Sequence, residues 1–119
     1  EKPEWIGVTI HKLDKNLDTG PILYQAKPDL QTNWSYRHIE YSLTKLSYDI
    51  VPKAMEEVLS GKNDVVNQDL SEGKTYFSKE YTEECESRLN NEYVSKQIEK
   101  YLLNKNNLDK GVELINEWK

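Results

Sequence analysis

Two aspartates share a short loop near the start of the chain, within the stretch GVTIHKLDKNLDTGPILYQ (residues 7–25). Asp18 follows Asp14 by four positions, and Thr-Gly-Pro comes directly after Asp18. A loop carboxylate can transfer protons, bind a cation, or close a turn by accepting hydrogen bonds from its own backbone. The residue types favour the turn, because Asp, Asn, Gly and Pro are common turn residues. A site carboxylate remains the alternative.

The loop does not indicate a metal site. Its two aspartates and Asn16 superficially resemble part of a calcium loop, but the other ligand positions, including a distal bidentate glutamate, are missing. We therefore predict no metal. His11 precedes the loop and could point toward a site, although a histidine on a strand is more often a half-buried structural residue. Both interpretations of His11 remain open.

The segments on either side of the loop are predicted to be strands. Residues 5–13, WIGVTIHKL, are rich in β-branched side chains, and residues 21–30 begin after a Gly-Pro turn signal. The loop between them, residues 14–20, is longer than a tight hairpin requires. Loops of this kind often carry functional groups.

Residues 32–61 have the pattern of a long helix. Polar residues that favour N-caps precede it, and Gly61 provides a stop. Pro52 lies inside the pattern, so we predict a kink there or two helices that meet near Ile50. The apolar residues that form its stripe, at spacings of three or four, are Ile39, Leu43, Leu46, Ile50, Ala54 and Val58.

We divide the chain at residue 62, because residues 63–119 are more polar and mainly helical in pattern. Residues 73–82 resemble a short extended segment. A first helix is predicted to carry Val94, Ile98, Tyr101 and Leu102 on one face. A second, weakened by Gly111, is predicted to carry Leu108, Val112, Ile115 and Trp118 and to form a hairpin with the first.

Composition narrows the partners and the compartment. The net charge of −5 comes from acidic and basic residues mixed along 119 residues, so no basic face favours nucleic acid. No apolar run reaches the length of a membrane span and no signal peptide is present, so we expect a cytoplasmic protein. The first residue is Glu1 rather than Met, and we expect a processing or proteolytic boundary there.

The two histidines and the single cysteine differ in what they suggest. His38 lies among polar residues of the helical pattern, and we expect it to face solvent. Cys85 lies among glutamates in TEECESR, and an acidic surround raises the pKa of a thiol rather than activating it. One cysteine cannot form an internal disulfide, which fits a reducing compartment.

The stretch around the loop resembles the C-terminal half of the catalytic domain of the 10-formyltetrahydrofolate-dependent formyltransferases. The family pattern is approximately Gly-Val/Thr-Thr/Ser-Val/Ile-His and then Leu-Asp-Thr/Gly-Gly-Pro/Asp-Ile. This chain supplies GVTIH at residues 7–11 and LDTGPI at residues 17–22. The resemblance extends through SYDIVPKAMEEVLSGK and covers about residues 5–62.

The resemblance implies an α/β fold, the C-terminal part of a doubly wound domain, with two strands and a long kinked helix followed by the helical tail. It implies that 10-formyltetrahydrofolate supplies the formyl group to an amine acceptor. Asp18 matches the catalytic aspartate that assists proton transfer and orients an oxyanion-stabilising histidine. The pterin-binding loop corresponds to Asp14, Lys15, Asn16, Leu17 and Asp18, with Asp14 more suited to shaping the turn, and His11 matches a strand histidine.

One departure from the family is large. The Asn-x-His-Pro motif that carries the family's catalytic Asn and its companion His is absent from this chain. Catalytic groups of this kind work as a unit, so we expect the 119 residues to be inert alone. The alternative is a non-catalytic interaction or oligomerisation module derived from that fold, with a homodimer formed through exposed strand edges.

The acceptor is chosen only by elimination. The methionyl-tRNA branch typically adds a basic β-barrel, and residues 63–119 are neither strand-rich in pattern nor basic. A small amine acceptor, such as an amino sugar nucleotide or a ribonucleotide amine, is favoured.

Overall fold

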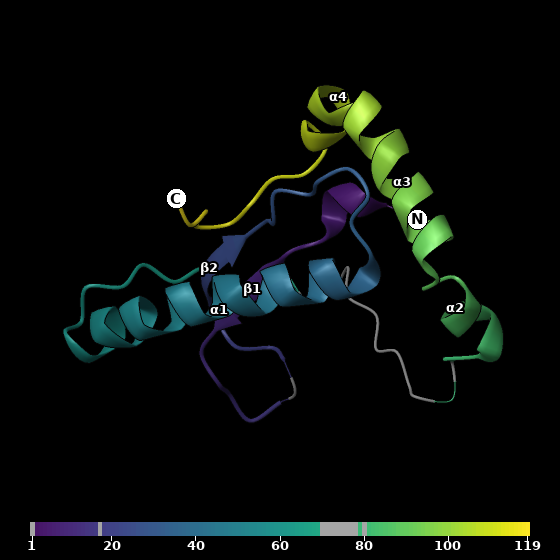
Figure 1. The fold of residues 1–119 in the computed structure, drawn as a ribbon. Helices are drawn as coiled ribbons and strands as arrows, with labels where there is room; N and C mark the ends of the chain where they lie inside the picture. Colours follow the sequence, from purple (N-terminus) through teal and green to yellow (C-terminus); the bar gives the residue numbers. More distant parts are fainter. Residues whose placement is uncertain (1, 17, 70–78, 80) are drawn as a thin grey trace.

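The computed structural model describes residues 2–16, 18–69, 79 and 81–119 (Figure 1). In chain order its elements are the short 3-10 helix η1 (Pro3–Trp5), strands β1 (Val8–His11) and β2 (Ile22–Ala26), and helices α1 (Tyr36–Leu59), α2 (Glu83–Ser87), α3 (Asn91–Leu103) and α4 (Lys105–Asp109). The described part of the chain is therefore mixed α/β. The doubly wound organisation stays a prediction.

The two predicted strands are present but shorter than residues 5–13 and 21–30. They pair antiparallel, with Val8 opposite Ala26 and Thr9 opposite Gln25. The register shifts between Ile10 and His11, so that His11 lies opposite Ile22 at the end of the pairing. This irregularity places His11 where the strand gives way to the acidic loop.

β2 is paired along both of its edges. On the side away from β1, the Ile22 N–H donates to the Val66 carbonyl at 2.7 Å and the Val66 N–H donates back at 3.1 Å. Further along, the Trp118 N–H donates to the Gln25 carbonyl at 2.9 Å. The Asn116 side chain joins these two flanking segments through the Asp64 carbonyl at 3.1 Å. Dimerisation through a strand edge therefore stays a prediction for β1 alone.

α1 is a single helix of 24 residues that runs without interruption through Pro52. The alternative of two helices that meet near Ile50 is therefore wrong, and the kink at Pro52 stays a prediction. A proline removes the hydrogen bond to the carbonyl of Tyr48, but both residues are exposed, so water can satisfy that carbonyl.

The ends of α1 are formed as the sequence predicts. At its start, the Ser35 N–H donates to the His38 Nδ1 at 3.0 Å. At its end Gly61 has a φ of 70°, and the Lys62 N–H donates to the Glu57 carbonyl at 2.9 Å, the geometry with which a glycine ends a helix. His38 is exposed, as expected.

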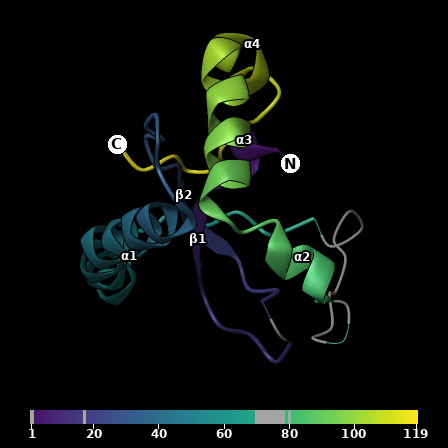
Figure 2. The same cartoon turned by 45° about the vertical axis from the view of Figure 1, so that its right-hand side comes forward.

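The core lies between α1, the sheet and α3 (Figure 1 and Figure 2). Ile50 and Ala54 are buried on the side of α1 that contacts the strands, and the Tyr24 hydroxyl donates to the Glu57 carboxylate at 2.9 Å. The buried cluster that joins α1 to α3 consists of Leu30, Ile39, Val94, Ile98 and Tyr101, with Leu102 packed against it. The predicted apolar face of α3 is thus confirmed.

The predicted helix through Leu108 and Trp118 is wrong. α4 ends at Asp109, and the chain beyond Gly111 crosses back to lie beside β2 (Figure 1). Glycine weakens a helix, and the extended chain gains backbone bonds with Gln25 and an edge-on contact between the Trp118 and Tyr24 rings, 5.1 Å apart. The predicted extended segment at residues 73–82 lies mostly outside the described residues.

Gly20 lies where the two ends of the loop between β1 and β2 come close together. A Cβ at this position would lie 1.5 Å from the Lys12 carbonyl oxygen. A hydrogen bond fixes the adjacent backbone, since the Lys12 N–H donates to the Pro21 carbonyl at 2.9 Å. We therefore predict that Gly20→Ala lowers the free energy of unfolding by about 1–3 kcal/mol, as overpacking does.

Denaturant unfolding of the two glycine variants measures this effect. Gly111→Ala is the matched control, because a Cβ there meets only the Leu108 carbonyl oxygen at 3.5 Å, an ordinary contact. We expect its midpoint to stay close to that of the wild type. Equal midpoints for Gly20→Ala and the wild type would contradict the close approach at Lys12.

Candidate functional site

The acidic loop connects β1 to β2, and its first aspartate is used within the loop. The Asp14 Oδ1 accepts hydrogen bonds from the Asn16 N–H at 2.8 Å and from the Thr19 hydroxyl at 2.7 Å. The bond from Thr19, followed by that from Asn16, lowers the pKa of Asp14. This is the turn-forming role that residue types favour, so Asp14 shapes the loop.

The second aspartate lies differently. Asp18 has a φ of 56°, in the left-handed region, and 80% of its side chain is exposed. Its Oδ1 lies 3.7 Å from the Nε2 of His11, whose side chain is only 20% exposed. The loop therefore places an accessible carboxylate beside a largely covered imidazole.

His11 is oriented by its neighbour in the chain. Its Nδ1 lies 2.8 Å from the Lys12 carbonyl oxygen, which can only accept a hydrogen bond. Nδ1 must then carry the hydrogen, and Nε2 is left as the nitrogen that can take or give a proton beside Asp18. The two side chains together can hold and pass a proton.

Gln68 anchors the same loop from a distant part of the chain. Its Nε2 donates to the Asp18 carbonyl at 3.0 Å and to the Gly20 carbonyl at 2.6 Å. These bonds hold the backbone of the residue with positive φ. No sequence signal pointed to Gln68, because its role depends on the pairing of Val66 with Ile22 rather than on any local pattern.

The structure brings most of the predicted site residues together in this loop. Lys15 and Asn16 are exposed, as are the two aspartates, and Leu17 lies outside the described residues. Within the described part of the chain, no group of three or more His, Cys, Asp or Glu side chains could hold a metal ion. The loop thus presents exposed polar and charged residues, two of them aspartates.

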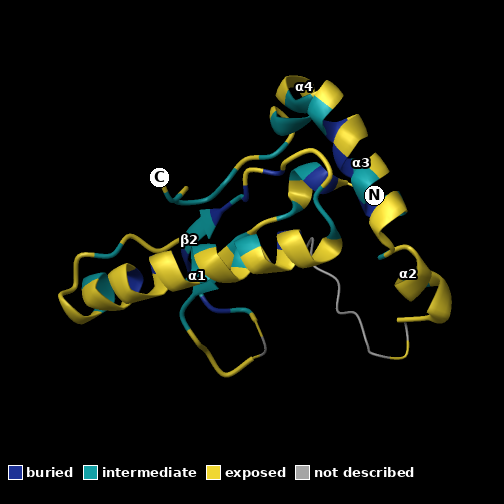
Figure 3. Ribbon diagram, in the orientation of Figure 1, coloured by how far each residue is buried: buried dark blue, intermediate teal, exposed yellow. Residues whose placement is uncertain are grey.

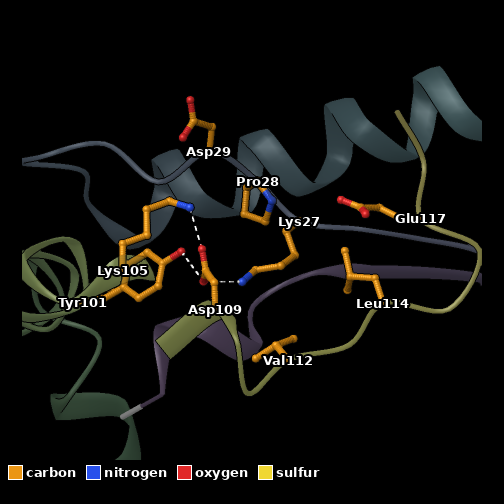
Figure 4. Close-up of a pocket in the computed structure, with 9 residues that line it drawn as sticks. All are labelled: Lys27, Pro28, Asp29, Tyr101, Lys105, Asp109, Val112, Leu114 and Glu117. Carbon is orange, nitrogen blue, oxygen red and sulfur yellow. Dashed lines mark hydrogen bonds and ion pairs between the residues drawn. The ribbon is translucent and has the colours of Figure 1, made fainter. Parts of the chain in front are cut away.

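A second polar cluster surrounds Asp109 in a hollow of about 320 Å³ (Figure 4). The Asp109 carboxylate accepts hydrogen bonds from the Lys27 Nζ at 2.9 Å, the Tyr101 hydroxyl at 2.8 Å and the Lys105 Nζ. Both ammonium groups also lie about 6 Å from the centre of the Tyr101 ring. The cluster ties α4 and α3 to the chain that follows β2.

The protonation of Asp109 reflects these partners. Partial burial is the largest single influence and raises the pKa, but the hydrogen bonds from Lys105, Lys27 and Tyr101 together outweigh it. The pKa of Asp109 is lowered to about 2. Because three donors already converge on this one carboxylate, the cluster acts as a structural clamp.

The pKa of the Cys85 thiol differs from the expectation. The hydroxyl of Thr82 lies 3.5 Å from the Cys85 Sγ, and the hydrogen bonds with Thr82 lower the pKa of the thiol. The glutamate surround predicted a raised pKa, and the contact with Thr82 at the start of α2 outweighs it.

Comparison with known proteins supports the family resemblance over part of the chain. A methionyl-tRNA formyltransferase from Wolbachia sp. subsp. Drosophila simulans (strain wRi) is 40% identical over 52 residues, 44% of this chain. The match spans 17% of the length of that protein. No family model matches the chain. No solved structure matches it either. The match indicates a relationship to formyltransferases.

Among the described residues, no helix is both long enough and apolar enough to span a membrane.

The clamp at Asp109 makes a prediction about acid stability. Its pKa is about 2 in the folded chain and 3.8 ordinarily, so its contribution is present above about pH 4 and is lost as the pH falls toward 2. We predict that Asp109→Asn lowers the free energy of unfolding by about 1–2 kcal/mol at neutral pH. The difference from the wild type should shrink below about pH 4.

Unfolding measured between neutral and acid pH tests this prediction. Asp29→Asn is the matched control, because Asp29 borders the same hollow with an exposed side chain that points away from Asp109 (Figure 4). We expect little effect from it. A deficit for Asp109→Asn that is unchanged at the lowest pH would contradict an ionised clamp.

Proposed function

We propose that this chain carries part of the catalytic site of a 10-formyltetrahydrofolate-dependent formyltransferase, which moves a formyl group to an amine. The observation that carries the proposal is the position of Asp18 beside His11, 3.7 Å apart, in a loop whose sequence has the family's motif. The 40% identity with a methionyl-tRNA formyltransferase over 52 residues supports the same relationship.

The folate would supply the formyl group when bound. The loop has features that fit it, since Lys15, Asn16 and Asp18 are exposed while the Asp14 carboxylate is occupied within the turn. The loop can therefore present backbone groups in a fixed shape to a flat, polar ring. Leu17, which the resemblance also assigns to this contact, lies outside the described residues.

Asp18 has the role of accepting a proton from the attacking amine, directly or through one water molecule. Its exposed carboxylate can reach a bound acceptor, and the Nε2 of His11 can share the proton because Nδ1 is committed to the Lys12 carbonyl. Gln68 is a positioning residue in this scheme, since it fixes the backbone of Asp18 without contacting the reacting atoms.

The acceptor we propose is a small amine, an amino sugar nucleotide or a ribonucleotide amine. The described residues of 63–119 form three helices and extended segments, and the chain carries a net charge of −5, which does not suit a long stretch of RNA backbone. Methionyl-tRNA remains in the experiment as a competing acceptor, because the matching relative bears that name.

Formyl transfer by the complete gene product tests the role of Asp18. We predict that Asp18→Asn lowers kcat roughly 100-fold to 10,000-fold, the usual range for loss of a general acid or base. Asp14→Asn is the control with the same change of charge, because an asparagine Oδ1 can still accept the bonds from Asn16 and Thr19. We expect it to retain most of the activity.

The outcomes separate the proposal from its alternative. An Asp18→Asn enzyme with unchanged kcat would refute the role of Asp18. Absence of transfer to every acceptor by the complete gene product would favour a non-catalytic interaction module. The 119-residue chain assayed alone should be inactive, because the Asn-x-His-Pro motif is absent from it.

A further inference from the structure

α1 is apolar on two opposite sides. One side is buried, and Ile39, Ile50 and Ala54 lie within it. The opposite side faces solvent along the length of the helix (Figure 3). The large apolar residues exposed there, which we call the outer stripe, are Tyr41 (72% exposed), Tyr48 (76%), Met55 (59%) and Leu59 (86%).

Helical geometry makes these four residues a single row. At about 100° per residue, spacings of seven, seven and four place them within about 40° of one another around the helix. The same geometry places Ile50 on the far side of the helix from Tyr48. The row extends about 27 Å along the axis. Large apolar residues exposed along one side of a helix are typical of an interaction surface.

We propose that the outer stripe binds the outer stripe of a second copy of this chain, with the two α1 helices antiparallel. The argument for a second copy, rather than another partner, is that two oppositely charged residues beside the stripe can pair across a two-fold axis. Lys45 and Glu56 lie on the same flank of the stripe, toward its two ends. Within the described residues, neither of them forms an ion pair.

An antiparallel two-fold pair brings the same flank of both helices together and reverses their order. Lys45 of one copy then lies opposite Glu56 of the other, twice, about a centre near residues 50 and 51. A parallel two-fold pair would bring opposite flanks together, so neither Lys45 nor Glu56 would meet a partner of opposite charge from this flank. The charges therefore select one orientation.

The same register also matches the apolar side chains. With Lys45 opposite Glu56, the stripe residue nearest to Tyr41 is Leu59 of the other copy, and the one nearest to Tyr48 is Met55. Large rings are thereby set against slender aliphatic chains, and the tyrosine hydroxyls can remain at the wet edge, as they commonly do at interfaces. The register that pairs Lys45 with Glu56 thus also matches the apolar side chains.

The predicted dimer differs from association through strand edges. Both edges of β2 are already paired within the chain, whereas the outer stripe is exposed over the whole of α1. Two helices of this length form a small interface, so we expect a dissociation constant on the order of micromolar. This inference does not depend on the proposed function.

Charge exchange on the complete protein tests the pairing. Lys45→Glu alone sets two carboxylates against each other in both contacts, and Glu56→Lys alone sets two ammonium groups against each other. Each variant should weaken self-association about tenfold or more, measured by sedimentation velocity across micromolar concentrations. An equimolar mixture of the two variants should associate again, because both contacts of the mixed dimer then pair opposite charges.

Controls make the result specific. Lys53→Glu reverses an exposed charge on another side of α1, and its self-association should match the wild type. If a charge reversal unfolds the protein, Lys45→Gln and Glu56→Gln are measured instead, and each should weaken association less strongly. Two results would overturn the proposal. One is a wild-type protein that stays monomeric at a concentration about 100-fold above micromolar. The other is a mixture of the two variants that does not associate.

Discussion

The pairing of β2 is the constraint on which the rest of the structure depends. Ile22, Leu23 and Ala26 of this strand are buried, so its backbone polar groups must find partners within the protein. β1 provides them on one edge, and segments at Val66 and at residues 116–118 provide them on the other. Parts of the chain that are far apart in sequence are brought together because each pairs with the same five-residue strand.

The geometry of the candidate site depends on this pairing. Val66 bonds to Ile22, and Gln68, two residues further on, is thereby brought to the carbonyls of Asp18 and Gly20. The two aspartates of the loop then differ through their partners. Asp14 accepts local hydrogen bonds and shapes the turn, whereas Asp18 is left exposed beside His11. Two residues of the same type therefore have different surroundings in the folded chain.

Local patterns in the sequence were sufficient for the elements but not for their long-range partners. The two strands, the stop of α1 at Gly61 and the buried face of α3 follow from periodicity and turn chemistry, and the structure has them. The course of residues 112–119 beside β2 could not be predicted, because it depends on backbone bonds with Gln25, which is far away in the sequence. The role of Gln68 was missed for the same reason.

The exposure of Asp18 also bears on the surroundings that the proposed proton transfer requires. Because 80% of the Asp18 side chain is exposed, water screens the interaction of its carboxylate with neighbouring groups, including His11 at 3.7 Å. Proton transfer by a positioned carboxylate is most effective where water is excluded and the donors are fixed. If Asp18 is catalytic, another surface must cover it in the working enzyme. Among the described strands, β1 pairs only with β2, so its other edge is open to such a surface.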